Sequence, residues 1–252
     1  MERAASQQPF LGVPFASTGP AEALAWVRGA ASADDRFRYV VTPNVDHVVM
    51  LHKAGNEAWR TDYRAAVAGA DLVVNDSRIL ARLARFSGIA LPVVPGSDLT
   101  RDLVTHGIGP CDGVILVGGS SVEAAWLQRA LPRSRIFHFE PPMGVRDNPA
   151  LQDRIAEFVE RQDAAFVLLA IGAPQSELVA ARIAARGKAR GVALCIGASV
   201  EFLSGTRRRA PRWMQRLSLE WAFRLISEPR RLWRRYLVEG PRIFLIWLNS
   251  RA

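Results

Sequence analysis

An aspartate that directly follows a short apolar run is the residue of this sequence best suited to acid–base chemistry. Residues 72–74 are apolar, Asn75, Asp76 and Ser77 follow, and a helical pattern begins at once at Arg78. A carboxylate between a buried strand and the start of a helix either caps that helix or serves as a general base. Taken alone, the position fits capping better, because Asp is a common N-cap residue.

Four further apolar runs are followed by small or polar residues that could bind a ligand. They are Thr42-Pro43-Asn44, Gly118-Gly119-Ser120, Gly172-Ala173-Pro174 and Gly197-Ala198-Ser199. Backbone N–H groups at Gly118 and Gly119 could approach a phosphate at a helix start, although a tight turn explains the same pair equally well. Thr42 and Asn44 could be turn or cap residues, and Glu177, in a first helical turn, suits the helix dipole whatever its function.

The sequence offers little to hold a metal ion. No Asp-x-Asp motif occurs, so a metal-held nucleotide diphosphate is not favoured. His47 and His52 are spaced i, i+5 rather than the i, i+4 that places two ligands on one helical face. We therefore expect no metal and no other cofactor, and the charge of a leaving group would have to be met by N–H groups and arginines.

Short continuous apolar runs alternate along the chain with helical patterns. Strands are expected at residues 39–42, 72–74, 113–117, 135–139, 166–171 and 192–196. Helices are expected at residues 21–29, 45–54, 61–68 and 78–86, after 95–98, at 120–130 and 148–161, and from 175 onward. This alternation predicts an α/β, Rossmann-like parallel sheet with helices on both faces, whose carboxyl rim the polar segments should line. Residues 1–19 carry little signal and are expected to be partly loose.

The C-terminal stretch differs in composition from the rest of the chain. Residues 204–252 contain 12 Arg, no Lys and only three acids, so the whole formal net charge of +9 lies there, together with four of the seven Trp. We therefore divide the chain into a Rossmann-like catalytic domain, residues 1–203, and an Arg/Trp-rich appendage, residues 204–252. Arg rather than Lys suggests bidentate phosphate contacts as well as bulk attraction.

The appendage has the pattern of two basic amphipathic helices, one from Pro211 to about Ser227 and one from Pro229. If the bend between them is mild, three arginines share one face: Arg224, Arg231 and Arg234. Such helices edged with Trp are typical of a surface that lies on an anionic membrane. A solvated charged face over a packed stripe is the plain alternative. Nucleic acid ranks lower, because the aromatic residues do not fall among the arginines.

We expect the chain to stay in the cytoplasm, peripheral on the inner face of the plasma membrane. The start MERAASQQPF lacks a basic region followed by an apolar run, and no segment reaches the roughly 20 apolar residues that span a bilayer. The closest segment, residues 243–248, is too short and is expected at an interface. Cys111 and Cys195 are accordingly expected to be reduced.

The order of these segments resembles the WecG/TagA/CpsF glycosyltransferases, glycosyltransferase family 26, over roughly residues 38–238. The matching segments are Thr42-Pro43-Asn44, Asp76, Pro95-Gly96-Ser97-Asp98, Val117-Gly118-Gly119, residues 172–177 and residues 208–236. The last is the most specific, since four short motifs in it match in order and spacing. They are Arg209-Ala210-Pro211, Glu220-Trp221, Arg224-Leu225 and Glu228-Pro229-Arg230-Arg231.

The resemblance implies an inverting, metal-independent transfer of a sugar from a UDP-sugar to a polyprenyl-diphosphate-linked saccharide in bacterial cell-surface or exopolysaccharide biosynthesis. The sugar would be of the N-acetylmannosamine, glucose or uronic acid type. The resemblance puts the catalytic aspartate at Asp76. The residues placed at the donor are Thr42, Asn44, Gly118, Gly119, Ser176 and Glu177. The arginines placed at the acceptor and the diphosphate are Arg224, Arg231 and Arg234.

Three positions depart from the family pattern. Ser77 stands where the family usually has Gly, Val93 where it usually has Arg, and Ser176 where it usually has Gln. These changes concern the donor contacts, and with them the identity of the sugar, more than the class of reaction. The rival hypothesis is a non-catalytic module that binds a nucleotide or a nucleic acid and carries a basic tail, but the retained Asp76 and Asn44 speak against it.

Overall fold

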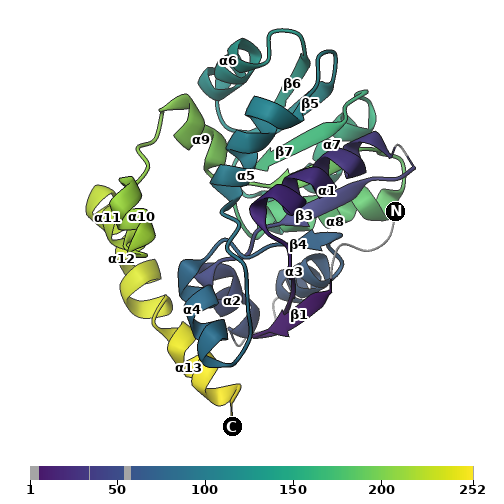
Figure 1. The fold of residues 1–252 in the computed structure, drawn as a ribbon. Coiled ribbons are helices and arrows are strands. Elements are labelled where there is room, and N and C mark those ends of the chain that lie inside the picture. The colour runs from purple at the N-terminus through teal and green to yellow at the C-terminus, as the bar shows by residue number, and fades with distance from the viewer. Residues whose placement is uncertain (1–5, 34, 54–57, 252) are drawn as a thin grey trace.

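A six-stranded parallel sheet forms the centre of the computed structural model, which describes residues 6–33, 35–53 and 58–251 (Figure 1). The strand order is β4-β3-β8-β7-β5-β6, and every neighbouring pair is parallel. The strands are β3 (Arg38–Val41), β4 (Leu72–Val73), β5 (Gly113–Gly118), β6 (Arg135–Phe139), β7 (Phe166–Ala170) and β8 (Val192–Cys195). The predicted Rossmann-like sheet is confirmed, and all six strands lie where the apolar runs placed them.

The sheet is covered on both faces, which explains why its strands are continuously apolar. Along β5, Val114 and Leu116 belong to one buried cluster, whereas Ile115 and Val117 belong to the other. Successive residues of a strand point to opposite faces, so a strand between two helical layers needs apolar residues at every position. Helices α1, α5 and α6 cover the first face, and α2, α3, α7 and α8 cover the second.

Nine α-helices belong to the described part of the chain before residue 205. They are α1 (Pro20–Ser32), α2 (Val45–His52), α3 (Ala58–Ala68), α4 (Arg78–Phe86), α5 (Gly96–Asp102), α6 (Ser121–Ala130), α7 (Pro149–Glu160), α8 (Gln175–Arg186) and α9 (Ser199–Ser204). A π-helical turn η1 (Leu103–Gly107) extends α5, and a 3₁₀ turn η2 (Val145–Asp147) precedes α7. The expected end of α2 at residue 54 lies outside the described residues.

The N-terminal segment forms a hairpin that the sequence did not reveal. β1 (Gln7–Phe10) pairs antiparallel with β2 (Val13–Ala16), and Val13 and Phe15 are fully buried. The expectation of a partly loose start is therefore wrong for residues 7–16, while residues 1–5 lie outside the described part. The turn passes through Leu11 and Gly12, whose φ angles are 50° and 74°. Leucine seldom adopts a positive φ, so the Leu-Gly pair does not have the sequence of a common hairpin turn.

The appendage is a chain of short helices rather than two longer ones. They are α10 (Arg212–Arg216), α11 (Glu220–Ser227), α12 (Pro229–Trp233), a π-helical turn η3 (Arg234–Glu239) and α13 (Arg242–Asn249). The predicted single helix from Pro211 to Ser227 is wrong, because the backbone turns left-handed at Ser218, with φ of 63°. A serine at that position gives no sequence signal of a break. The predicted helix start at Pro229 is confirmed.

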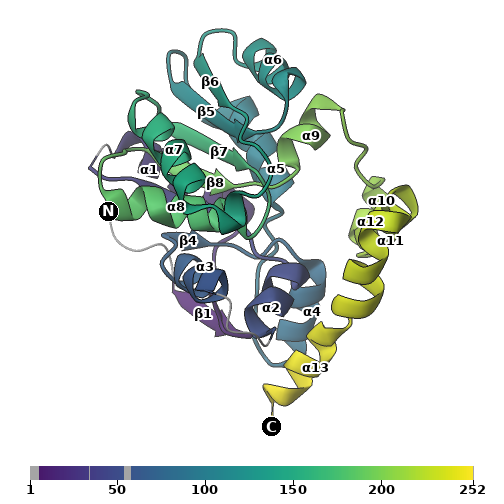
Figure 2. The same ribbon diagram turned by 180° about the vertical axis from the view of Figure 1, so that it is seen from behind.

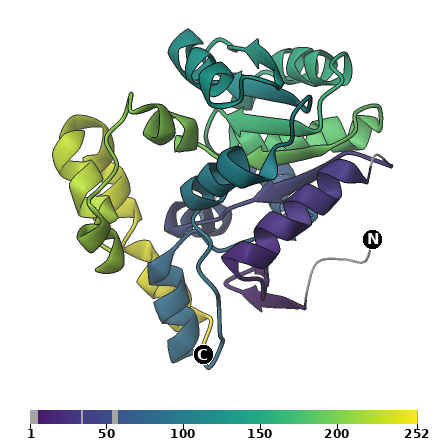
Figure 3. The ribbon, with the colours of Figure 1, turned by 45° about the horizontal axis from the view of Figure 1, so that its top comes forward.

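The appendage runs along the body from α9 down to α13, which lies beside α4 and α2 (Figures 1 and 2). Ile243 of α13 is buried in the core cluster that includes α2, and Trp247 Nε1 donates a hydrogen bond to Ser87 Oγ at 2.9 Å. Figure 3 shows the appendage at the left, apart from α1, which packs on one face of the sheet. The division of the chain at residue 204 stays a prediction.

Candidate active site

Asp76 follows β4 at the carboxyl edge of the sheet, and its carboxylate does not cap the next helix. The cap of α4 is Ser77, whose Oγ accepts a hydrogen bond from Leu80 N at 3.2 Å. Asp76 instead points across the rim, where its Oδ1 accepts a hydrogen bond from Gly96 N at 2.9 Å. Of the two roles that the sequence left open for Asp76, the structure removes the capping role and leaves a carboxylate available for chemistry.

Burial raises the pKa of the Asp76 carboxyl to about 6, against the lowering effect of the hydrogen bond from Gly96. The carboxylate of Glu220 raises this pKa further, whereas Arg224 and His47 lower it. Glu220 and Arg224 both belong to α11, so their influence on this pKa indicates that α11 of the appendage lies near Asp76. A pKa near 6 makes Asp76 ionised at neutral pH and still basic enough to accept a proton.

Thr42 and Asn44 lie beside Asp76, because β3 is the neighbour of β4. Thr42 Oγ1 donates a hydrogen bond to Cys195 O at 3.2 Å and packs against Gly96. A Cβ on Gly96 would lie 2.9 Å from Thr42 Oγ1, so only glycine lets the segment that holds Asp76 approach β3 this closely. Asn44 is the N-cap of α2. The structure thus brings together the predicted base and the first two predicted donor residues.

Ser176 and Glu177 turn inward rather than toward the rim. Ser176 Oγ donates a hydrogen bond to Leu169 O at 3.1 Å, which ties the first turn of α8 to the end of β7. The Glu177 side chain is buried, and its Oε1 lies 3.4 Å from His47 Nε2. In this conformation both side chains contact other protein groups behind the rim. Their direct contact with a donor stays a prediction.

Gly118 and Gly119 lie at the end of β5, away from Asp76. Four strand-to-strand intervals of about 4.8 Å separate β4 from β5, which is about 19 Å in all. Gly118 has φ of 86°, and a Cβ on it would lie 2.9 Å from Ala170 O, so the tight turn alone requires glycine. A phosphate role for the pair stays a prediction.

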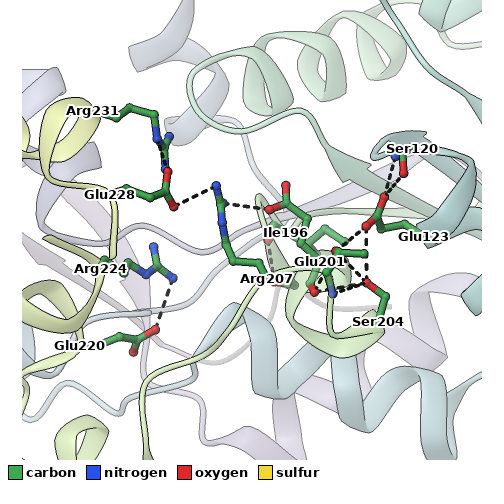
Figure 4. Close-up of polar contacts among 12 residues, drawn as sticks. Ser120, Glu123, Ile196, Glu201, Ser204, Arg207, Glu220, Arg224, Glu228 and Arg231 are labelled. Carbon is green, nitrogen blue, oxygen red and sulfur yellow. Dashed lines mark hydrogen bonds and ion pairs between the residues drawn. The ribbon is translucent and has the colours of Figure 1, made fainter. Parts of the chain in front are cut away.

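A carboxylate already occupies the N-terminus of α6 beside these glycines (Figure 4). Glu123 Oε2 accepts a hydrogen bond from Ser120 N at 2.7 Å, and Oε1 accepts one from Thr206 Oγ1. Burial alone would raise the pKa of Glu123, but the hydrogen bonds from Ser120 and Thr206 outweigh it and lower the pKa to about 2. A phosphate at this helix start would have to compete with that charge.

Of the three predicted appendage arginines, only Arg224 is among the charges that shift the pKa of Asp76. Its Nη2 lies 3.3 Å from Glu220 Oε1. Burial alone would lower the pKa of Arg224, but Tyr236, Glu220 and Asp76 outweigh it and raise the pKa. The guanidinium of Arg224 therefore interacts with Glu220 and Tyr236, and it is near enough to Asp76 for each to shift the pKa of the other.

Arg231 and Arg234 are exposed in this conformation and are not gathered around Asp76. Arg231 pairs with Glu228, which also pairs with Arg207 at 3.2 Å, and Arg207 pairs in turn with Glu201 at 2.9 Å (Figure 4). No ion pair is recorded for Arg234 among the described residues. The line of pairs ties α12 to α9, at the top of the appendage.

Two ion pairs that the sequence did not predict attach the appendage to α2. Arg235 pairs with Asp46 at 2.7 Å, and Lys53 pairs with Glu239 at 3.2 Å. Asp46, Lys53 and Glu239 line a cavity of about 670 Å³ between α2, α3, η2, α7, α8 and η3. Arg235 lies in the C-terminal segment that resembles the family, so the sequence marked its position. Only the structure shows that η3 is rotated so that Arg235, rather than Arg234, faces the body.

Among the residues that the structure describes, no helix is both long enough and apolar enough to cross a membrane. No group of three or more His, Cys, Asp or Glu side chains in the described ranges is arranged as a metal site. Cys111 and Cys195 are free thiols, as expected.

The sequence model of the WecG/TagA/CpsF glycosyl transferase family matches residues 8–252, so this chain belongs to that family. The matched region includes the appendage as well as the sheet. The chain is therefore a glycosyltransferase of cell-surface polymer synthesis, which implies in general a nucleotide-sugar donor and a lipid-linked acceptor.

Proposed function

We propose that this chain transfers one sugar from a UDP-sugar to a polyprenyl-diphosphate-linked saccharide, with inversion at the anomeric carbon, in bacterial cell-surface or exopolysaccharide biosynthesis. The sugar is of the N-acetylmannosamine, glucose or uronic acid type. One observation carries the proposal most directly. A carboxylate with a pKa of about 6, Asp76, lies at the carboxyl rim beside Pro43 and within electrostatic reach of Arg224, in a family of glycosyltransferases.

Asp76 acts as the general base in this reaction. The acceptor hydroxyl attacks the anomeric carbon from the face opposite UDP, and its proton passes to the Asp76 carboxylate. A new bond forms between the acceptor oxygen and the anomeric carbon. The bond to the diphosphate oxygen breaks, and its electron pair leaves with UDP. A single displacement of this kind inverts the configuration. General-base assistance contributes about 10²–10⁴-fold to the rate.

Arg224, which is only partly exposed, supplies positive charge for the diphosphate. Arg231 and Arg234 are exposed and could meet the diphosphate of the lipid once the acceptor arrives. With arginines in this role, the proposed reaction needs no metal, which agrees with the missing Asp-x-Asp motif.

The appendage carries an exposed apolar and basic surface, which we name the docking ridge. Its exposed apolar side chains are Trp213, Leu217, Trp221, Ile226, Trp233, Leu237, Val238, Phe244, Leu245 and Leu248. Phe86 of α4 extends the ridge onto the body, where its ring lies 6.3 Å from that of Trp247. Exposed arginines flank these residues, among them Arg230, Arg234 and Arg242.

The docking ridge suits the anionic inner face of a plasma membrane. Large apolar patches on a soluble surface usually mark an interaction site. Each Arg near an anionic lipid surface contributes about 1 kcal/mol to binding, so the net charge of the appendage could hold the protein there without a spanning helix. Because α11 lies near Asp76, the same appendage would bring a lipid-linked acceptor to the base.

The proposal is tested by incubating the purified chain with synthetic polyprenyl-diphosphate-linked monosaccharides and a panel of UDP-sugars. We expect UDP release that requires both substrates, and a product whose new glycosidic bond has the configuration opposite to that of the donor. A product of retained configuration would refute the single displacement. Absence of transfer with every pair of the panel would refute the proposed substrates.

A further inference from the structure

A buried imidazole links the N-terminus of α2 to the N-terminus of α8 behind the candidate base. His47 is only 9% exposed, and its Nδ1 lies 3.0 Å from Asn44 Oδ1. Its Nε2 lies 3.4 Å from Glu177 Oε1, and Glu177 is only 2% exposed. Glu177, His47 and Asn44 thus form a chain of contacts from the core to the rim. The mechanism given above uses neither His47 nor this chain of contacts.

The orientation of the Asn44 amide follows from its hydrogen bonds. Asp46 N, a backbone donor, lies 3.0 Å from Asn44 Oδ1, so the oxygen and not the nitrogen of the amide must be on that side. The same oxygen faces His47 Nδ1. The Nδ2 group of Asn44 is left with two N–H donors for which no partner is recorded among the described residues.

The contact with Asn44 Oδ1 is a hydrogen bond only when Nδ1 of the imidazole carries a proton, because that oxygen is an acceptor. The contact with Glu177 places no such demand on the ring, since a carboxyl can accept from a protonated Nε2 or, when it is itself protonated, donate to a bare one. In the neutral tautomer with the proton on Nε2, Nδ1 could accept from Asn44 N at 3.4 Å, but its lone pair would then face Asn44 Oδ1 at the shorter distance of 3.0 Å.

We propose that Glu177 and His47 form a positioning pair that holds the Asn44 amide with its two N–H groups toward the donor. Asn44 then donates hydrogen bonds to an acceptor oxygen of the sugar nucleotide, and it cannot accept one. Glu177 acts through His47 and touches no substrate. The inference rests on the proposed function, because it takes the ligand at this rim to be a UDP-sugar.

Three substitutions separate this role from a merely structural one. Asn44→Asp keeps an oxygen cap for α2 but removes both N–H donors, so we expect kcat/KM for the UDP-sugar to fall by more than about tenfold. His47→Gln and Glu177→Gln should raise KM for the UDP-sugar by about 3- to 10-fold. At about pH 8, where Asp76 stays ionised even without the lowering effect of His47 on its pKa, kcat should change less than twofold. His52→Gln, an exposed histidine on the same helix, is the matched control and should change neither constant.

A double-mutant cycle shows whether His47 acts through Asn44. If it does, Asn44→Asp combined with His47→Gln is no worse than Asn44→Asp alone. Independent, multiplying effects of the two substitutions on KM would overturn the inference. An equal loss of kcat in His47→Gln would overturn it too, since it would place the ring at the reacting atoms.

A spectroscopic measurement keeps this inference separate from the proposed function. ¹⁵N spectra of the folded wild-type chain should show His47 with a proton on Nδ1, the nitrogen that faces Asn44 Oδ1. A neutral ring protonated at Nε2 alone in the wild-type chain would overturn the inference whatever the enzyme transfers. Failure of the proposed function would instead appear as absence of transfer by the wild-type chain while the His47 signals remain as expected.

Discussion

Replacing Asp76 with asparagine isolates the charge of the candidate base from its shape. Asn keeps an oxygen that can accept the hydrogen bond from Gly96 N, which Asp76 Oδ1 now accepts at 2.9 Å. Alanine would leave that donor without its partner, at a cost of about 1–3 kcal/mol. Asp76→Asn therefore changes little except the ability to ionise and to take a proton.

The raised pKa gives this substitution a defined effect on stability. A carboxyl that titrates at about 6 in the folded chain and at about 3.9 in the unfolded chain is harder to ionise when folded. Below pH 4 both states are protonated, and the difference contributes nothing. Between about pH 4 and pH 6 the wild-type fold loses stability, by about 1–3 kcal/mol in total, and above pH 6 the loss is constant. Asp76→Asn avoids this loss.

We therefore expect Asp76→Asn to be more stable than the wild type at pH 8 and about equal to it at pH 4. Urea unfolding at the two pH values measures the difference. Release of UDP, measured with the lipid-linked acceptor, should fall by about 10²–10⁴-fold in the same variant. Asp163→Asn is the control, because that side chain is 89% exposed and lies at the opposite edge of the sheet.

Two results would refute the reasoning. Near-normal UDP release by Asp76→Asn would remove this residue from the mechanism. A variant that is less stable than the wild type at pH 8 and at pH 4 alike would show that the carboxylate is not disfavoured by burial, and the pKa argument would fail while the catalytic role remained open to test.

Three other outcomes are expected. Wild-type kcat/KM should fall about tenfold between pH 7 and pH 5, because an Asp76 with a pKa of about 6 is mostly protonated at pH 5, and a flat profile would contradict this. Gly96→Ala should lower the free energy of unfolding by about 1–3 kcal/mol, since its Cβ would lie 2.9 Å from Thr42 Oγ1, and an unchanged urea midpoint would contradict it. Arg230→Glu combined with Arg242→Glu should weaken pelleting with phosphatidylglycerol vesicles at least about tenfold. The control is Arg28→Glu combined with Arg154→Glu, on α1 and α7, which changes the net charge equally. An equal loss of pelleting in the control would refute a docking ridge confined to the appendage.

The sequence determined the sheet and the place of the candidate base on it. A strand buried on both faces must be apolar throughout, so residues 113–117 and 166–171 could be recognised one by one from composition. The carboxyl ends of parallel strands lie along one edge, so Asp76 and Thr42 could be assigned to one rim from their positions alone. The order of motifs along the chain also identified the family.

Tertiary structure decided which of these side chains meet. Ser77, not Asp76, caps α4, and Glu177 faces His47 rather than the rim, because the direction of a side chain depends on how its helix is rotated against the sheet. Along η3, Arg235 pairs with Asp46 while Arg234 does not, although both have the same composition around them.

The rotation of the appendage follows from packing far along the chain. Burial of Leu232 and Ile243 fixes which side of α12 and α13 faces the body, and Ser218 breaks the helix that the sequence pattern predicts to be continuous. Local propensity carries no information about such partners, since they lie more than a hundred residues away. The sequence therefore determined what chemistry the chain could do, and the packing of helices against the sheet determined which atoms are close enough to do it.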